Sequence, residues 1–289
     1  MKKKIISVIV GVAGLAAAYF VVSGISHIVY NRPVDNAATE STAETTEQGT
    51  EEAKAAMTED EINEMLAGMK ATETAETATE EQSEVIPVKF EELQAVNPDI
   101  YAWITVPGTV IDYPILQHAS DNTYYLMHNI DGSYGYPGCV YTENMNSKDF
   151  TDNNTVIYGH NMKNGSMFAQ LHKFEDPDFF NENREVLIYL PDEVLHYTIF
   201  AAHVYDDRHL LYSFDFTDPE VYQKYLDSIF STRDMSANID KDITVTTDDQ
   251  IITLVTCIGS QPNNRLLVQA VLTDREAGAE TARAAAATE

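Results

Sequence analysis

The sequence is short of basic residues and of cysteine. Its 289 residues include 18 Lys and Arg against 46 Asp and Glu, for a formal net charge of −28. Phosphate binding needs a basic patch, so this balance argues against nucleic acid as a partner. Cys139 and Cys257 are the only cysteines. The chain therefore holds one disulfide or two thiols, and we find no cysteine–histidine spacing typical of a zinc site.

Long uncharged apolar stretches are also rare, and the clearest one is at the N-terminus. Lysines in residues 1–4 precede the uncharged stretch 5–25, which as a helix spans roughly 30 Å, the hydrocarbon thickness of a bilayer. A cleaved signal peptide is the alternative, but the stretch exceeds the usual length and lacks an A-x-A site at its end. We expect an uncleaved transmembrane anchor over 5–30, with residues 1–4 cytoplasmic and the rest outside the cell.

Residues 31–85 lack aromatic side chains and have few large apolar ones. Such a Thr/Glu/Ala-rich segment buries too little surface to offset its ordering entropy, so we expect a disordered acidic spacer. Within it, "TEDEINEMLAGMKA" combines Thr58 and Glu61 of a capping box with apolar residues at helical spacing. This pattern predicts a helix that is transient or binds a partner. The low-complexity tail 275–289 is also expected to be disordered.

Residues 86–274 differ from the flanking segments in amino-acid composition, and we predict that they form the folded domain. Aromatics occur throughout, and short strand-like stretches such as 101–106, 154–160, 242–246 and 250–257 end at Gly, Pro, Asn or Asp. Helices are expected over 90–99, 166–176 and 218–233; in the last, Asp218 is the cap and Pro219 the first residue. Regular strand–helix alternation is missing, which disfavours a Rossmann-type sheet and favours a mostly-β barrel or sandwich.

The stretch "QIITLVTCIGSQPNNRLLVQAVL", residues 250–272, carries the first candidate chemistry. Two apolar runs flank a polar loop, 258–264. Cys257 closes the first run, and Arg265 opens the second as the only basic residue between Lys241 and Arg275. A hairpin would place both at one end of a sheet, where a guanidinium stabilises a thiolate or an oxyanion. The plain alternatives are a packed or disulfide-bonded Cys257, paired with Cys139, and a surface arginine.

A nucleophilic cysteine needs a base, and "VIYGHNMKNGSMF" supplies His160 at a strand end beside a polar loop. His172 and His196 fit a helix face or the surface, and the remaining histidines have similarly plain interpretations. The acidic clusters "DDRH" and "TTDDQ" lack metal-loop spacing and fit a solvated surface. No metal and no other cofactor is expected.

"TLVTC" followed by Arg265, together with "NTVIYGHNMKNGSMFAQL", resembles the sortases, the cysteine transpeptidases of Gram-positive surfaces. "YAWITVPGTVIDYPILQ", "DNTYYLMHN" and the helix at 218–233 resemble class B in particular, so that the resemblance covers about 90–272. It implies a mostly-β fold: a sortase-type eight-stranded β-barrel with an N-terminal helical extension and a helix between two late strands, preceded by one transmembrane helix. It also implies site residues, with catalytic roles for His160, Cys257 and Arg265, and a peptide groove lined by Asn122, Leu126 and Thr256.

The function implied is cleavage of a C-terminal sorting pentapeptide of surface proteins through a thioester, with transfer to an amine of peptidoglycan or its lipid-linked precursor. The N-terminal helix would hold the enzyme on the cell membrane with the catalytic domain extracellular. The short loop before Arg265, which contains Pro262, departs from other class B loops and bears on signal choice. Two alternatives remain: a secreted cysteine endopeptidase with the same site, and a non-catalytic surface scaffold with a Cys139–Cys257 disulfide.

Overall fold

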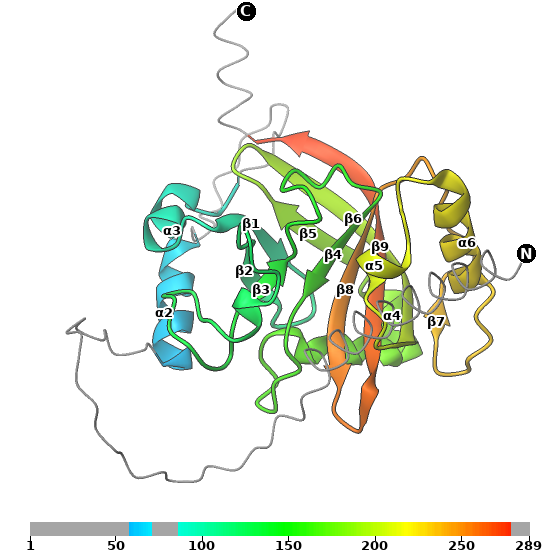
Figure 1. Cartoon of the computed structure of the whole chain (residues 1–289), viewed down its shortest axis with the longest axis horizontal. Coiled ribbons are helices and arrows are strands. Elements are labelled where there is room, and N and C mark those ends of the chain that lie inside the picture. The colour runs from blue at the N-terminus through cyan, green and yellow to red at the C-terminus, as the bar shows by residue number, and fades with distance from the viewer. Residues whose placement is uncertain (1–57, 71–85, 279–289) are drawn as a thin grey trace, which may run out of the picture. The chain divides into compact units, whose positions relative to one another are not determined.

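The computed structural model describes residues 58–70 and 86–278. Eight of its strands close a barrel in the order β5-β1-β2-β3-β4-β8-β9-β6, and β6 pairs with β5 to complete the ring (Figure 1). The barrel strands are β1 (Ile100–Thr105), β2 (Asp112–Leu116), β3 (Val140–Thr142), β4 (Asn154–Tyr158), β5 (Glu185–Tyr189), β6 (Glu193–Asp206), β8 (Ile251–Ile258) and β9 (Gln261–Ala277). The short β7 (Asn238–Ile239) pairs with β6. The expected eight-stranded β-barrel is confirmed.

The helical segments lie between these strands or ahead of them. They are α2 (Glu59–Met69), α3 (Phe90–Val96), η1 (Tyr124–Leu126), η2 (Phe168–Glu175), α4 (Pro177–Glu182), α5 (Leu210–Ser213) and α6 (Pro219–Phe230). The predicted cap of α6 is present, because the Asp218 side chain accepts a hydrogen bond from the Glu220 N–H. The helix expected over 166–176 is instead the 3₁₀ helix η2, followed by α4. The prediction of a strand over 242–246 is wrong. These residues form no strand, and Val245 packs in the part of the core that lies against α6.

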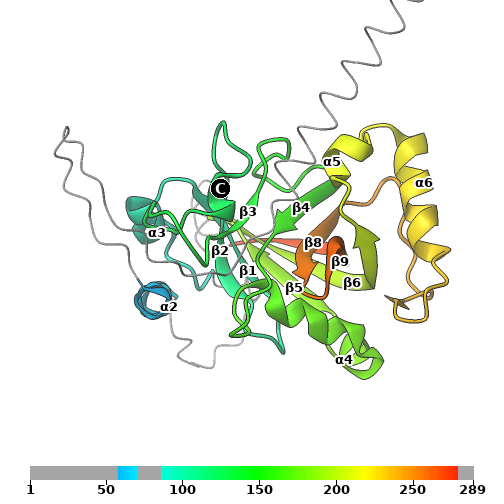
Figure 2. The same ribbon diagram turned by 60° about the horizontal axis from the view of Figure 1, so that its bottom comes forward.

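Two layers of core cover the strand that carries the candidate cysteine. Leu254 and Val268 face the barrel interior and are fully buried. On the outer face, α6 covers Val255 and Leu267. Every residue of β8 is therefore buried except Cys257, which is exposed. Figure 2 shows α6 along the outside of the β8, β9 and β6 wall.

The helix α2 corrects the expectation of an unstructured spacer. Its predicted capping box is present: the Thr58 hydroxyl accepts from Glu61 N–H, and the Glu61 carboxylate accepts from Thr58 N–H. Ile62 and Leu66 are buried in a core cluster shared with β1 and β2. For residues 58–70 the prediction of disorder is wrong, because the apolar face of the helix is buried against the barrel. Residues 31–57 and 71–85 lie outside the described residues.

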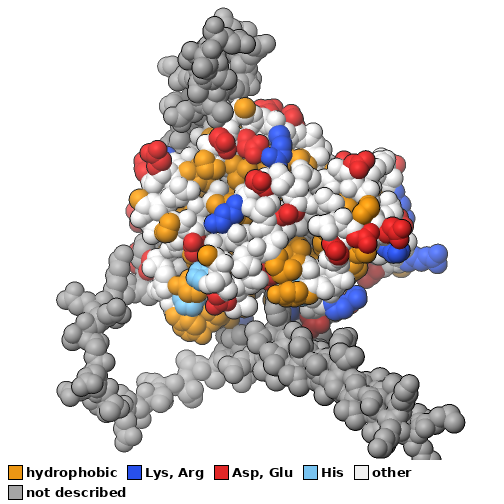
Figure 3. Space-filling view, turned by 45° about the horizontal axis from the view of Figure 1, so that its top comes forward, with side chains coloured by type: hydrophobic (Ala, Val, Ile, Leu, Met, Phe, Trp, Pro, Cys, Tyr) orange, Lys and Arg blue, Asp and Glu red, His pale blue; other side chains and the backbone are white. Residues whose placement is uncertain are grey.

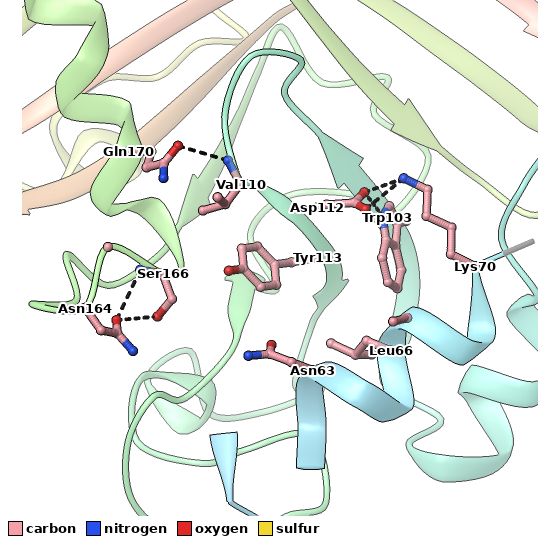
Figure 4. A pocket seen from close by; sticks show the side chains of 12 residues that line it. Asn63, Leu66, Lys70, Trp103, Val110, Asp112, Tyr113, Asn164, Ser166 and Gln170 are labelled. Carbon is pink, nitrogen blue, oxygen red and sulfur yellow. Dashed lines mark hydrogen bonds and ion pairs between the residues drawn. The ribbon is translucent and has the colours of Figure 1, made fainter. Parts of the chain in front are cut away.

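An ion pair and a pocket mark where α2 meets the barrel (Figure 4). Lys70 Nζ lies 2.7 Å from Asp112 Oδ1, and the same oxygen accepts from Trp103 Nε1 and Thr105 Oγ1. A pocket lined on one side by α2 residues such as Asn63 opens beside this pair. Lys70 and Asp112 thus join the C-cap residue of α2 to the first residue of β2.

The domain also ends later than predicted. β9 continues to Ala277, and Arg275 Nη1 makes a 2.8 Å ion pair with Glu193 at the start of β6. The expected boundary at 274 is therefore wrong for residues 275–278, because they extend the β6–β9 ladder. The rest of the tail lies outside the described residues.

On the face shown in Figure 3, Asp and Glu side chains are spread over the surface with few Lys and Arg between them. Among the described residues there is no group of three or more His, Cys, Asp or Glu arranged to hold a metal ion. None of the helices in this described part is both long and apolar enough to cross a bilayer. The anchor predicted over 5–30 lies outside the described residues.

Candidate active site

Cys257 and Arg265 are direct neighbours on the β8–β9 hairpin. They are register partners, with Cys257 opposite Arg265 and Thr256 opposite Leu266. Side chains of directly opposed residues lie on the same face of a sheet, so the thiol and the guanidinium share the outer face of the barrel. The expected loop over 258–264 is shorter than predicted, because Ile258 already pairs with Gln261. The residues between Gln261 and Arg265 form a bulge in β9 opposite this register shift.

The bulge orients the Arg265 guanidinium. Its Nη1 donates to the carbonyl oxygens of Pro262 and Asn264, both at 2.9 Å. Within the described residues, Nε and Nη2 make no hydrogen bond and keep their N–H groups for another acceptor. A planar guanidinium held at one nitrogen presents its remaining donors in a fixed direction. This is the arrangement that an oxyanion site beside Cys257 requires.

His160 lies just beyond β4, which runs parallel to β8. Its neighbours on both sides contact β8: Gly159 N–H donates to the Val255 carbonyl, and Asn161 Nδ2 donates to the Cys257 carbonyl at 2.8 Å. His160 Nε2 donates to the Leu126 carbonyl at 2.7 Å. Burial lowers the pKa of the His160 imidazole, and the Leu126 hydrogen bond opposes this in part.

Tyr136 and Gly138 shape the surroundings of His160. The Tyr136 ring packs edge-on against the imidazole with 5.2 Å between ring centroids. Burial raises the pKa of the Tyr136 phenol, and the negative charge of a Cys257 thiolate adds to this rise. Gly138 has a φ of +67°, and a Cβ there would lie 2.8 Å from the Leu126 carbonyl oxygen. Glycine at 138 therefore leaves the Leu126 carbonyl free to meet His160.

Comparisons with known proteins show which protein family this chain belongs to. A family model described as Sortase domain matches residues 104–273, more than half of the chain. The chain belongs to the sortase family. It is 34% identical to a sortase B of Listeria monocytogenes over 195 residues, which are 67% of this chain and 76% of that protein. It is 28% identical to a sortase B of Staphylococcus aureus over 184 residues, 63% of this chain and 73% of that one.

Solved structures agree with the sequence relatives. The Clostridium perfringens sortase B structure superposes with a TM-score of 0.59 at 34% identity, covering 64% of this chain and all of that one. This protein is thus a class B-like sortase, a cysteine transpeptidase that anchors surface proteins to the cell wall. The eight-stranded β-barrel and the enzyme class expected from the sequence are confirmed.

Cys139, the other cysteine of this sortase, differs from Cys257 in its surroundings. Both thiols are free; Cys139 is buried, while Cys257 is exposed. Cys139 Sγ donates to the His128 carbonyl at 3.4 Å, and burial raises the pKa of its thiol well above the usual range. A buried thiol with a raised pKa is a packed side chain and a poor nucleophile. The disulfide on which the scaffold alternative depends is not formed.

The three residues predicted to line the sortase peptide groove have different surroundings. Leu126 has an exposed side chain on η1 and a carbonyl bound to His160. Asn122 Oδ1 accepts from the Asn144 N–H at 2.9 Å and supports the loop after β3. Thr256 is buried, and its hydroxyl donates to the Gly159 carbonyl at 2.9 Å, which ties β8 to the end of β4. Leu126 is the one whose side chain is open to a peptide, and groove contacts for all three stay predictions.

His172 contacts the backbone of Cys257, a contact that the sequence did not predict. The sequence predicts a surface or helix-face residue, and His172 does lie on η2, yet its Nε2 is 3.1 Å from the Cys257 carbonyl oxygen. Its Nδ1 is 2.8 Å from Glu175 Oε2. The spacing of His172 and Glu175, three residues apart in a segment expected to be helical, was the available signal. Contact with a strand 85 residues away had no local signal.

Proposed function

We propose that Cys257 is the nucleophile of this sortase, that Arg265 stabilises the oxyanion and that His160 is the acid–base. The observation that carries this proposal is the register of the hairpin. It places the one exposed residue of β8 directly opposite an arginine that uses a single nitrogen, Nη1, to bind the carbonyls of the bulge. The substrate is the C-terminal sorting pentapeptide of a surface protein. A structure of a sortase B–substrate complex from Staphylococcus aureus, 27% identical to this chain, supports a peptide substrate.

In the first half-reaction, the Cys257 thiol gives its proton to His160, and the thiolate sulfur attacks the threonine carbonyl carbon of the sorting signal. The carbonyl oxygen becomes an oxyanion and accepts hydrogen bonds from Arg265. When the tetrahedral intermediate collapses, the C–N bond breaks and the imidazolium returns its proton to the departing amine. A thioester between Cys257 and the surface protein remains.

The hydrogen bond at His160 selects the nitrogen that carries this proton. Because Nε2–H donates to the Leu126 carbonyl, Nδ1 is the nitrogen that gains and loses a proton. Burial lowers the pKa of His160, so the neutral imidazole is favoured at neutral pH. It then acts as the base in the second half-reaction, taking a proton from the incoming amine as that amine attacks the thioester.

The acceptor is an amine of peptidoglycan or of its lipid-linked precursor, and the enzyme works outside the cell, held to the membrane by residues 5–30. The lysines of residues 1–4 and the uncharged stretch after them support this topology. Protease added to intact cells should then remove the catalytic domain. A domain that resists protease until the cells are lysed would contradict it.

The test of the reaction is mass analysis of the products formed from a labelled sorting peptide and candidate amines. We expect an amide of the peptide with the preferred amine, formed by the wild type and by Cys139→Ala and abolished in Cys257→Ala. A product that is always the free acid, even at saturating amine, would replace the transpeptidase with the endopeptidase alternative.

A further inference from the structure

The carbonyl oxygen of Cys257 lies just past the end of the hydrogen-bonded pairing between β4 and β8. Along a strand, the carbonyls of residues i and i+2 point to the same side. The Val255 carbonyl accepts from Gly159 N–H on the β4 side, so the Cys257 carbonyl points to that side too. Strand β4 ends at Tyr158, and no main-chain donor of β4 reaches this oxygen.

Side chains take the place of the missing strand. Asn161 Nδ2 donates to the Cys257 carbonyl at 2.8 Å, and His172 Nε2 lies 3.1 Å from the same oxygen. Asn161 Nδ2 and His172 Nε2 are 3.0 Å apart. Behind them, Glu175 Oε2 is 2.8 Å from His172 Nδ1. Four polar contacts thus join three side chains to one backbone oxygen of the nucleophile.

The hydrogen-bond donors and acceptors of this cluster match in both the neutral and the protonated form of His172. The Glu175 carboxylate accepts from His172 Nδ1–H, which fixes the tautomer. In the neutral imidazole, Nε2 then accepts one hydrogen of the Asn161 amide while the other goes to the Cys257 carbonyl. In the imidazolium, Nε2–H donates to that carbonyl itself. The oxygen keeps a donor in both states, so the cluster holds it whichever form His172 takes.

We propose that Asn161, His172 and Glu175 are positioning residues that hold the backbone of Cys257 and so align its thiol with His160 and Arg265. Asn161 follows His160 directly in the chain, and its backbone pairs with Met167 at the base of the 160–167 loop. One residue therefore ties the acid–base to the nucleophile. This inference rests on the proposed roles of Cys257 and His160.

Alignment should affect the chemical step more than peptide binding, because the cluster touches the backbone behind the thiol. A displacement on the order of 1 Å at a reacting group can cost about a hundredfold in rate. We expect Asn161→Ala to lower kcat for sorting-peptide cleavage about tenfold or more, with KM changed by less than about twofold. Alkylation of Cys257 by iodoacetamide needs a thiolate but no alignment, and its rate should change little.

The matched control is a second His–Glu pair on the same barrel. His196 Nδ1 lies 3.7 Å from Glu185 Oε1, and its side chain is 22% exposed against 24% for His172. We expect His172→Ala to lower kcat and His196→Ala to leave it unchanged. The double variant Asn161→Ala/His172→Ala should lose less than the product of the two single losses, since both act on one oxygen. Equal kcat in wild type and Asn161→Ala would overturn the inference.

A second measurement is independent of turnover. The chain has two cysteines, so labelling with [1-¹³C]cysteine gives two carbonyl signals, and Cys257→Ala identifies the one from Cys257. We expect Asn161→Ala to move that signal upfield, as for a lost hydrogen bond, and to leave the Cys139 signal in place. Glu175 is 41% exposed, so Glu175→Gln keeps the fold and should move the Cys257 signal the same way by less.

These two measurements separate the possible failures. A wild type that cleaves no sorting peptide, with the Cys257 signal still sensitive to Asn161, would refute the proposed function and leave the positioning contact standing. An unmoved signal would refute the contact, whatever the enzyme does to peptides. A kcat loss matched by slower alkylation would show that the cluster acts on the thiolate fraction, and the alignment role would be wrong.

Discussion

Arg265→Lys keeps a positive charge opposite Cys257 and removes the planar fork. In the wild type, Nη1 is taken by the carbonyls of Pro262 and Asn264, and other nitrogens of the same side chain remain for the oxyanion. A lysine has a single nitrogen, which must serve both the bulge carbonyls and the substrate. Loss of one oxyanion donor costs about 10²–10³ in rate in other enzymes, or roughly 3–4 kcal/mol. We expect at least about a tenfold loss in kcat for Arg265→Lys and about a hundredfold or more for Arg265→Ala.

The assay is cleavage of a quenched sorting peptide by the three enzymes at low and high salt. Arg208 provides the matched control, since its side chain is 61% exposed and pairs with Asp206; Arg208→Lys should behave as wild type. If charge alone matters, Arg265→Lys will nearly restore activity, and salt will weaken the wild type as it screens exposed charges. Full activity in Arg265→Ala would remove Arg265 from the site and leave a Cys–His pair as the catalytic apparatus.

The remaining predictions concern stability and the second thiol. Cys139→Ala should cost about 1 kcal/mol of stability and keep most activity, because Cys139 is a packed side chain; native alkylation should modify one thiol and denaturing alkylation two. Leu66→Ala should cost about 2 kcal/mol or more by calorimetry, since Leu66 is buried between α2 and the barrel; an unchanged melting temperature would show that α2 is undocked. Burial lowers the pKa of His203 as it does that of His160. The unfolded chain then binds more protons below a pH of about 6.5, so stability should fall as the pH drops through that value, and His203→Gln should reduce the slope.

Local chemistry was enough to predict many elements of this protein from sequence. Asp218 and Pro219 define the start of α6, and Thr58 with Glu61 defines the start of α2, because capping depends on residues within one turn. The two apolar runs around Cys257 and Arg265 predicted a hairpin with both residues at one end. The sortase-like motifs in these same stretches implied the barrel that the structure confirms.

Local sequence propensity gave wrong predictions where contacts between distant parts of the chain decide the structure. Residues 242–246 have strand propensity, but Ile243 and Val245 pack on the α6 core and no described strand pairs with them. Residues 58–70 were expected in a disordered spacer, because their apolar face has no partner within the segment itself. The partner is the barrel wall, and burial against it supplies the free energy that an isolated helix lacks.

The order of residues supplies the reactive groups: a thiol at a strand end, an arginine eight positions later, and a histidine at the end of another strand. Tertiary structure alone decided which groups meet. Closure of the barrel brings β4 beside β8 and buries its inner face, while α6 covers the outer face and leaves Cys257 as the exposed residue of β8. It also brings Asn161 and His172 to the Cys257 carbonyl across 96 and 85 residues of chain. Such contacts depend on where β4 stops relative to β8, and no local pattern in the sequence encodes that offset.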